Sequence, residues 1–212
     1  MPHPTFRSLT LGALLATAVL PGAASAKQLA APACPVQPTT QSFASFGDLA
    51  DYALAPGGSF EGGAAGWTFT NAGVVAGNET LGLVPGTSSL KLGLSANGGA
   101  ATATSPEFCV NADNPSFRFV SQTARAAKLG VSYSYRRASD APDKVRAEST
   151  STLLSAGPLW SPSAITPLAT LLTSGNAQEA KYVRITFQLS AADVKAGGAS
   201  VDDVLVDPYR RS

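Results

Sequence analysis

The sequence has 212 residues with a formal net charge of +1, and only 14% of its residues are charged. A charge so close to zero gives no electrostatic reason to expect nucleic acid or an anionic membrane surface as a partner. The chain also contains 20 glycines and 15 prolines. This composition is typical of a β protein with many turns and argues against a long helical one.

The chain begins with the pattern of a secretory signal peptide. Arg7 precedes the apolar run Leu9–Leu20, and the small residues Ala24–Ala26 offer a cleavage site. The run is too short for a membrane span, which needs about 20 apolar residues. We therefore expect residues 1–26 to be removed and the rest to be a secreted, extracellular protein without membrane insertion.

The remaining chain is expected to form one domain, because it has no internal repeat and no long linker. Residues 27–36 are predicted to be an N-terminal tether, residues 37–209 the domain and residues 210–212 a tail. Nothing in the sequence calls for self-association, and we predict a monomer.

Histidine and cysteine usage excludes several kinds of site. The only histidine, His3, lies in the signal peptide, so the exported chain has no Ser-His-Asp triad and no histidine-ligated zinc. The only two cysteines are Cys34 and Cys109. In an exported protein they are predicted to form a disulfide, worth roughly 4 kcal/mol in the chain-entropy model.

Short alternating segments predict strands separated by turn-forming residues. The expected strands are residues 89–94, 117–119, 129–136, 182–189 and 201–206. Residues 46–54 are expected to contain a helical turn, and the proline-rich residues 157–173 a loop with an edge strand. Because no amphipathic helix of about 12 or more residues is evident, this pattern predicts an all-β, two-sheet antiparallel sandwich.

A glycine-rich stretch, GGSFEGGAAGWTF, places Phe60, Glu61 and Trp67 among residues that pack little. Trp67 can be a platform for stacking on a sugar or a plug in the core. Because it directly follows a glycine turn, we favour the core. Tyr133 and Tyr135 alternate with the apolar positions of their strand and are expected in the core as well.

Two motifs carry a resemblance to a known family. Gly-Ser-Phe-Glu at residues 58–61 is followed by Gly-Trp at 66–67, and Val-Asp-Asp-Val stands at 201–204. This pair resembles carbohydrate-binding modules with the jelly-roll, galactose-binding-like fold. The chain is also similar to a group of secreted actinobacterial proteins that combine both motifs with two cysteines.

The resemblance implies a structural calcium ion. In a jelly roll the first and last strands lie side by side, which would bring Glu61 close to Asp202, with Asp203 as a further ligand. Neighbouring carboxylates raise each other's pKa unless a cation lies between them, and calcium accepts carboxylate and carbonyl oxygens. Two alternatives are a capping Asp beside a solvated one, and a catalytic carboxylate pair of a glycosidase.

A ligand-binding surface is expected on the polar face of the sheets. Its candidate residues have planar or hydrogen-bonding side chains: Arg118, Arg136, Tyr182, Arg184 and Gln188. Trp160, in a proline-flanked loop, is a further candidate as an exposed aromatic. Such a face is also what an ordinary solvated sheet presents.

These observations predict a non-catalytic, secreted protein that binds polysaccharide or cell-wall glycan. The first alternative is a structural or adhesive surface protein without glycan binding. The second is an enzyme, which without histidine would have to rely on carboxylates alone or on Tyr and Arg.

Overall fold

The computed structural model describes residues 34–95, 97–110, 116–124, 126–154, 156–168 and 180–207, and for 147–153 the backbone only. The chain divides into two compact units, residues 1–30 and 31–212, and the described residues all belong to the second. The predicted signal peptide and tail lie outside these ranges and stay predictions.

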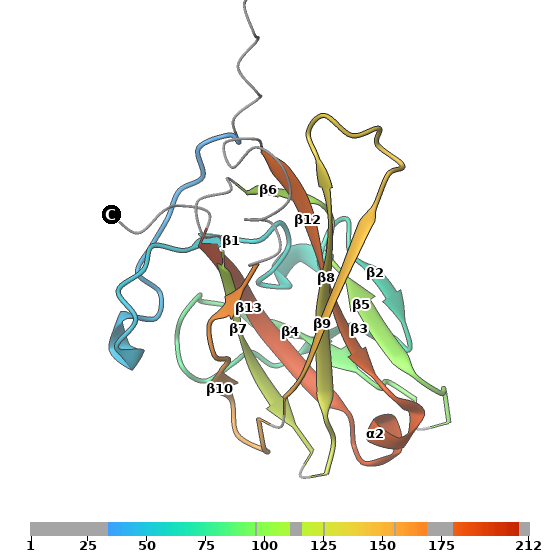
Figure 1. Cartoon of the computed structure of the whole chain (residues 1–212). Helices are drawn as coiled ribbons and strands as arrows, with labels where there is room; N and C mark the ends of the chain where they lie inside the picture. The colour runs from blue at the N-terminus through green and yellow to red at the C-terminus, as the bar shows by residue number, and fades with distance from the viewer. Residues whose placement is uncertain are drawn as a thin grey trace, which may run out of the picture. The chain divides into compact units, whose positions relative to one another are not determined.

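The described residues form two antiparallel sheets (Figure 1), which confirms the predicted β-sandwich. Sheet one has the strand order β10-β7-β13-β4-β3, with β1 paired to β13 and β11 paired to β7. Its strands are β1 (Ala53–Leu54), β3 (Ala72–Ala76), β4 (Ser88–Leu92), β7 (Ser116–Thr123), β10 (Ser161–Pro162), β11 (Thr166–Pro167) and β13 (Ala199–Asp207). The first and last of these strands are neighbours, as expected for a jelly roll.

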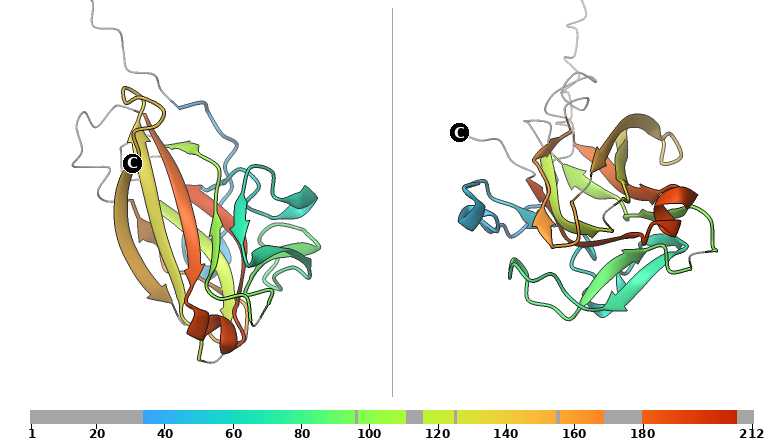
Figure 2. Two further views of the ribbon diagram at one scale, coloured as in Figure 1. Left: turned by 90° about the vertical axis from the view of Figure 1, so that its right-hand side faces the viewer. Right: turned by 90° about the horizontal axis from the view of Figure 1, so that it is seen from below.

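Sheet two has the order β2-β5-β12-β8-β9, with β6 also paired to β12. Its strands are β2 (Thr68–Thr70), β5 (Ala101–Thr104), β6 (Phe108–Val110), β8 (Leu129–Arg137), β9 (Arg146–Leu154) and β12 (Lys181–Leu189). The long β8–β9 hairpin forms one edge of this sheet and curls at its end (Figure 2). All five strands predicted from alternation are present.

Three short helical elements complete the described fold: η1 (Ala44–Phe46), η2 (Glu61–Gly63) and α2 (Ala191–Lys195). The helical turn expected within residues 46–54 is therefore misplaced, since Ala53–Leu54 form a strand. Helix α2 was not expected. The Ser190 side chain caps it by accepting a hydrogen bond from the Asp193 N–H, at 3.2 Å.

The main core lies between the two sheets and contains the aromatic residues of the glycine-rich stretch. Trp67 is 7% exposed and Phe60 is fully buried. Their rings meet edge to face at 5.0 Å, and Trp67 stacks on Phe187 at 6.2 Å. The core role predicted for Trp67 is confirmed, and Tyr133 and Tyr135 are also buried as expected.

Two glycines of the same stretch are required by close approach. Gly57 has φ +64°, and a Cβ there would lie 3.2 Å from the Trp67 ring. A Cβ on Gly58 would lie 2.7 Å from the Val204 carbonyl oxygen of β13. Any side chain at either position would push the turn away from the indole or from the last strand.

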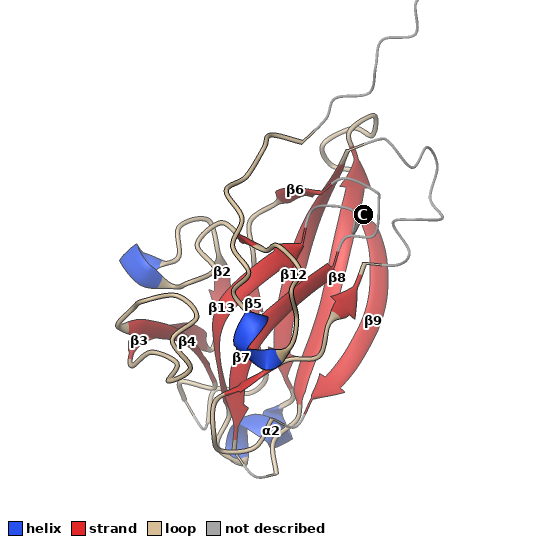
Figure 3. Ribbon diagram, turned by 90° about the vertical axis from the view of Figure 1, so that its left-hand side faces the viewer, coloured by secondary structure: helices blue, strands red, loops and turns tan. Residues whose placement is uncertain are grey.

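A second, smaller core covers the outer face of sheet one. Phe43, Ala50 and Tyr52, from the segment around η1, pack on Val120 of β7 and Leu205 of β13. Figure 3 shows this segment crossing the face of the sheet. The outer face of sheet one is therefore largely occupied by the chain itself.

Cys34 and Cys109 form the predicted disulfide, with their Cα atoms 5.5 Å apart. It ties the first described residue to β6. Within the described ranges no helix is both long and apolar enough to cross a membrane.

Candidate functional site

Two adjacent carboxylates lie buried at an irregularity in β13. The register between β13 and β7 shifts between Asp202 and Leu205, and Asp203 has the left-handed backbone angle φ 46°. Successive strand residues normally point to opposite faces. Here Asp202 accepts a hydrogen bond from the Glu79 N–H (3.0 Å) and Asp203 from the Val84 N–H (3.1 Å). Both carboxylates therefore face the β3–β4 loop, residues 77–87.

Four carboxylates hold this loop, and we name them the acid cluster: Glu61, Glu79, Asp202 and Asp203. Together they accept hydrogen bonds from the backbone N–H groups of Glu79, Leu81, Leu83, Val84, Thr87 and Ser88. A loop without regular structure would otherwise leave several of these donors unsatisfied. The acid cluster thus replaces the hydrogen bonds that a strand or helix would make.

Burial is the main cause of a raised pKa at both aspartates, since neither has any exposed surface. The pKa of Asp202 rises to about 7, with the charges of Glu79 and Glu61 adding to the effect of burial. The pKa of Asp203 rises to about 8, with the charge of Asp202 as the second cause. No Lys or Arg of the described ranges forms an ion pair with the acid cluster.

Polar atoms of the acid cluster, of Asn78 and of the Ser88 carbonyl lie close together beside Gly86. Asp203 Oδ1 is buried and has no hydrogen-bond partner among the described residues. The end of the Asn78 side chain lies 2.7 Å from Asp202 Oδ2 and 3.2 Å from the Ser88 carbonyl oxygen. A Cβ on Gly86 would lie 2.6 Å from Glu61 Oε1 and 2.8 Å from the Asn78 amide, so glycine keeps this space open.

The carboxylate and carbonyl oxygens of this region suit a hard cation such as calcium. One of them, the buried Asp203 Oδ1, has no hydrogen-bond partner among the described residues. With its nitrogen toward them, Asn78 donates to Asp202 Oδ2 and to the Ser88 carbonyl oxygen, and only the opposite orientation of the amide would offer its oxygen to a cation. Within the described ranges, no three acidic side chains are grouped closely enough to hold an ion by themselves. An ion here would also need oxygens such as those of Asn78 and the Ser88 carbonyl.

The second candidate region is the outer face of sheet two, the face turned away from the main core. In the register of the strands, Thr104 of β5 lies between Thr68 of β2 and Thr186 of β12, and Thr186 is opposite Ser132 of β8. The Oγ1 atoms of Thr104 and Thr186 are 3.0 Å apart. A row of hydroxyl groups therefore crosses four neighbouring strands.

The end of this face nearest β6 carries three of the predicted ligand-binding residues. Tyr182 lies opposite Arg136 across the β12–β8 pair, and the Arg136 guanidinium sits 4.1 Å from the centre of the Tyr182 ring. Arg184 follows two positions along β12, and all three lie around Glu107. Gln188 lies on the same face, farther along β12 and beside Gly130.

The structure corrects the prediction for Arg118 and Trp160. Arg118 is only 8% exposed, because the η1 segment covers it: its guanidinium pairs with Asp48 at 2.9 Å and lies 4.0 Å from the Phe43 ring centre. Trp160 is half-buried and packs against the second core. Arg118 therefore does not lie on an exposed sheet face, and Trp160 is less exposed than its proline-flanked loop suggested.

A cavity of about 280 Å³ opens beside Tyr182. Its polar lining comes from Glu107, Gln37 and Tyr182, and its apolar lining includes Pro35, Leu54 and Phe108. The volume is near the lower end of small-molecule sites, which span about 300–1,000 Å³. The cavity and the Arg136–Tyr182 stack share Tyr182 and Glu107, so one ligand can contact both.

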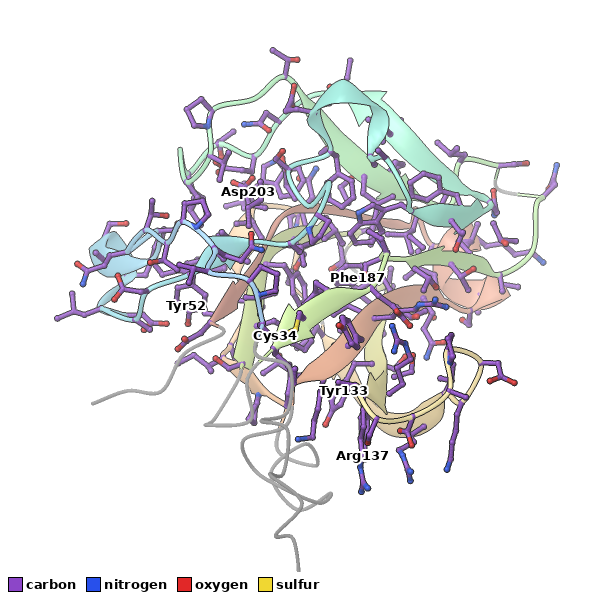
Figure 4. The ribbon with its side chains drawn as sticks, turned by 90° about the horizontal axis from the view of Figure 1, so that it is seen from above. Cys34, Tyr52, Tyr133, Arg137, Phe187 and Asp203 are labelled. Atoms are coloured by element: carbon purple, nitrogen blue, oxygen red, sulfur yellow. A yellow bond between two sulfur atoms is a disulfide. The ribbon has the colours of Figure 1, made fainter. Side chains whose placement is uncertain are left out.

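Three residues of these sites were missed in the sequence. Asn78 and Glu79 look like part of a turn, and Glu107 follows a proline with no motif around it. Only the folded loops bring them to the acid cluster and to the outer face. Figure 4 shows the two regions well separated, with Asp203 on one side of the sandwich and Arg137, next to Arg136 in β8, on the other.

Comparison with known proteins gives the fold. No protein-family model matches the sequence, and no curated protein matches it. A similar solved structure is the enzymatically active domain of tailspike protein 4 of bacteriophage CBA120, 17% identical with a TM-score of 0.51. The alignment covers 72% of this chain but only 20% of that chain, so this chain corresponds to about a fifth of the tailspike chain.

Two other similar structures are whole small domains. TmCBM61, a carbohydrate-binding module solved with β-1,4-galactotriose, is 13% identical with a TM-score of 0.43, over 74% of this chain and 98% of that chain. The K1 cleaved adhesin domain of Lys-gingipain from Porphyromonas gingivalis W83 is 12% identical with a TM-score of 0.36, over 73% and 96%. At 17% identity, the similarity to the tailspike domain bears on the fold of this chain and not on its function.

Proposed function

We propose that the chain is a secreted, non-catalytic protein that binds polysaccharide or cell-wall glycan through the outer face of sheet two and carries a structural calcium ion. The observation that supports it is the contrast between the two outer faces. The outer face of sheet one is covered by the chain's own second core, whereas the outer face of sheet two presents hydroxyl and guanidinium groups to solvent.

This face suits a ligand rich in hydroxyl groups. Threonine and serine hydroxyls both donate and accept hydrogen bonds, and a guanidinium donates in a fixed planar fork. Tyr182 adds an aromatic ring at the mouth of the cavity, where a pyranose ring has apolar carbons to pack on it. Together these groups offer the mixture of stacking and hydrogen bonding that sugar recognition requires.

The burial of the carboxylates supports a non-catalytic role. A glycosidase needs two carboxyl groups on either side of a bond in an accessible cleft. Asp202 and Asp203 have no exposed surface, and their hydrogen bonds go to the β3–β4 loop. In this proposal calcium would be held by Glu61, Asp202, Asp203 and neighbouring oxygens, and would fix that loop to β13. The signal-like start and the disulfide support secretion.

Retention on insoluble polysaccharides and on purified peptidoglycan tests the proposal, with the exported chain in calcium. We expect retention on at least one polymer and a loss of retention in Tyr182→Ser. A matched control is Leu159→Ser, which changes a 76% exposed side chain away from this face and should bind normally. Absence of retention on every polymer, with self-association in size-exclusion chromatography, would instead favour an adhesive or structural protein.

A further inference from the structure

One carboxylate on the outer face of sheet two is flanked by two guanidinium groups. Arg136 Nε lies 3.1 Å from both oxygens of Glu107, and Arg136 Nη2 lies 2.9 Å from Oε2. Arg184 Nη2 approaches Oε1 at 3.3 Å. Two positive charges and one negative charge leave this group, which we name the Arg-Glu-Arg group, with a net charge of +1.

The two arginines have different roles in the group. Arg136 is largely enclosed, with 16% of its side chain exposed, and is fixed by Glu107 on one side and the Tyr182 ring on the other. Arg184 has 46% of its side chain exposed, and within the described residues its one ion pair is the Nη2 contact with Glu107. A guanidinium has five N–H donors, so most of the donors of Arg184 are left for a ligand.

From this we infer the class of ligand: the Arg-Glu-Arg group recognises an oxyanion substituent, a carboxylate or a sulfate, on an acidic polysaccharide. The inference rests on the proposed glycan-binding function and narrows it. An oxyanion placed against Arg184 neutralises the excess charge of the group and accepts parallel hydrogen bonds from the guanidinium fork.

The cavity beside Tyr182 gives the sugar ring a place next to the charged group. Glu107 of the group lines the cavity together with Tyr182, on whose ring Arg136 stacks. In this inference the sugar ring lies in the cavity and its oxyanion points toward Arg184. The row of hydroxyls formed by Thr104, Thr186 and Ser132 continues along the face and can receive the neighbouring sugar residues. One polysaccharide chain could thus contact the cavity, Arg184 and the hydroxyl groups at the same time.

Affinity electrophoresis or titration calorimetry with three soluble polymers tests this inference. Polygalacturonate carries carboxylates, dextran sulfate carries sulfates, and dextran is neutral. We expect binding to at least one acidic polymer, weaker at high salt, and little binding to dextran. The two acidic polymers show which oxyanion the site prefers.

Three variants of the exported chain sharpen the test. Arg184→Gln should lower affinity for the acidic polymer by about tenfold, as expected for the loss of a charge-assisted hydrogen bond. Arg184→Lys keeps the charge but loses the planar fork, and should fall between that variant and the parent protein. Lys195→Gln removes an equal charge from the exposed part of α2 and should bind like the parent protein.

The outcomes separate this inference from the proposed function. Equal binding of dextran and the acidic polymers, unchanged in Arg184→Gln, would overturn the inference and leave glycan binding in place. Equal losses in Arg184→Gln and Lys195→Gln would also overturn it, because the attraction would then be general. Failure to bind any glycan, including those on the insoluble panel, would overturn both.

Discussion

Two buried carboxylate sites beside sheet one, at Asp48 and at Asp202 and Asp203, differ in the direction in which their pKa values are shifted. Burial by itself would raise the pKa of Asp48, but the Tyr52 hydroxyl at 2.7 Å, the Ala50 N–H and the Arg118 guanidinium at 2.9 Å together lower it. At Asp202 and Asp203 burial raises the pKa, and the nearby charges raise it further. The difference lies in the partner: Asp48 pairs with the Arg118 guanidinium, whereas Asp202 and Asp203 have carboxylates and backbone N–H groups around them and, among the described residues, no ion pair with Lys or Arg.

Removing the Arg118 guanidinium should make the surroundings of Asp48 more like those of Asp202 and Asp203. Arg118→Met removes the guanidinium that pairs with the buried Asp48, and also removes two hydrogen bonds to the Ser163 carbonyl. We expect the free energy of unfolding to fall by about 3–5 kcal/mol, measured by urea denaturation. The double variant Asp48→Asn/Arg118→Met should recover part of this loss. An unchanged urea midpoint in the single variant would contradict the comparison.

Supplying a cation to the second site should make it resemble the first. Calcium at about 100 times its dissociation constant would stabilise the fold by about 3 kcal/mol, or roughly 6–12 °C in Tm for a chain of this size. Thermal unfolding in EDTA, in calcium and in magnesium measures the shift. Arg118→Met should keep the same calcium shift, since its site is separate. Equal Tm values in EDTA and calcium would argue against an ion at the acid cluster.

The two sites should also respond to pH with opposite signs. A folded-state pKa raised above the unfolded value stabilises the fold at low pH, and that contribution is lost as pH rises through the folded pKa. In EDTA, the contribution of Asp202 and Asp203 should therefore be lost between about pH 4 and about pH 8. The lowered pKa of Asp48 gives a contribution that is lost only below its usual range. In EDTA, Tm should fall as the pH rises from about 4 to about 8. A Tm that does not change over this range would contradict the raised pKa values of Asp202 and Asp203.

Replacing Asp203 by an uncharged residue of the same shape should remove the stabilisation by calcium without destabilising the fold in EDTA. Asparagine accepts the left-handed backbone of Asp203 and has nearly the same shape. In EDTA at pH 8, Asp203→Asn should raise the free energy of unfolding by about 1 kcal/mol, because it removes a buried negative charge whose pKa burial raises to about 8. In calcium it should lose most of the calcium shift. A variant that keeps the full shift would remove Asp203 from the predicted ligands.

The strands and the core were predictable from local pattern. Residues 182–189 alternate regularly, so the strand and the burial of Val183, Ile185 and Phe187 follow from a period of two. The disulfide followed from having only two cysteines. Helix α2 had a readable signal that was overlooked: Ser190 followed three positions later by Asp193, an N-cap pattern.

The environments of charged residues were not predictable in the same way. Arg118 has the parity of a solvent-facing residue, and the structure buries it only because the η1 segment folds across β7. Glu79 and Glu107 reach their partners through loops whose paths depend on the whole fold. The two motifs led us to expect Glu61 near Asp202, and both side chains lie close to Asn78. The motifs did not indicate that Asn78 and the Ser88 carbonyl group would lie there as well.

The position of β13 has a consequence for how the chain folds. Residues 199–207 lie between β7 and β4, also pair with β1, and are buried along their whole length. Until this segment has been synthesised, β7 and β4 lack the strand that lies between them. The acid cluster also lacks two of its four carboxylates, those of Asp202 and Asp203. The pairings of β13 join residues between 76 positions apart (Ala199 with Thr123) and 153 positions apart (Ala53 with Val206), which predicts slow, late and cooperative folding.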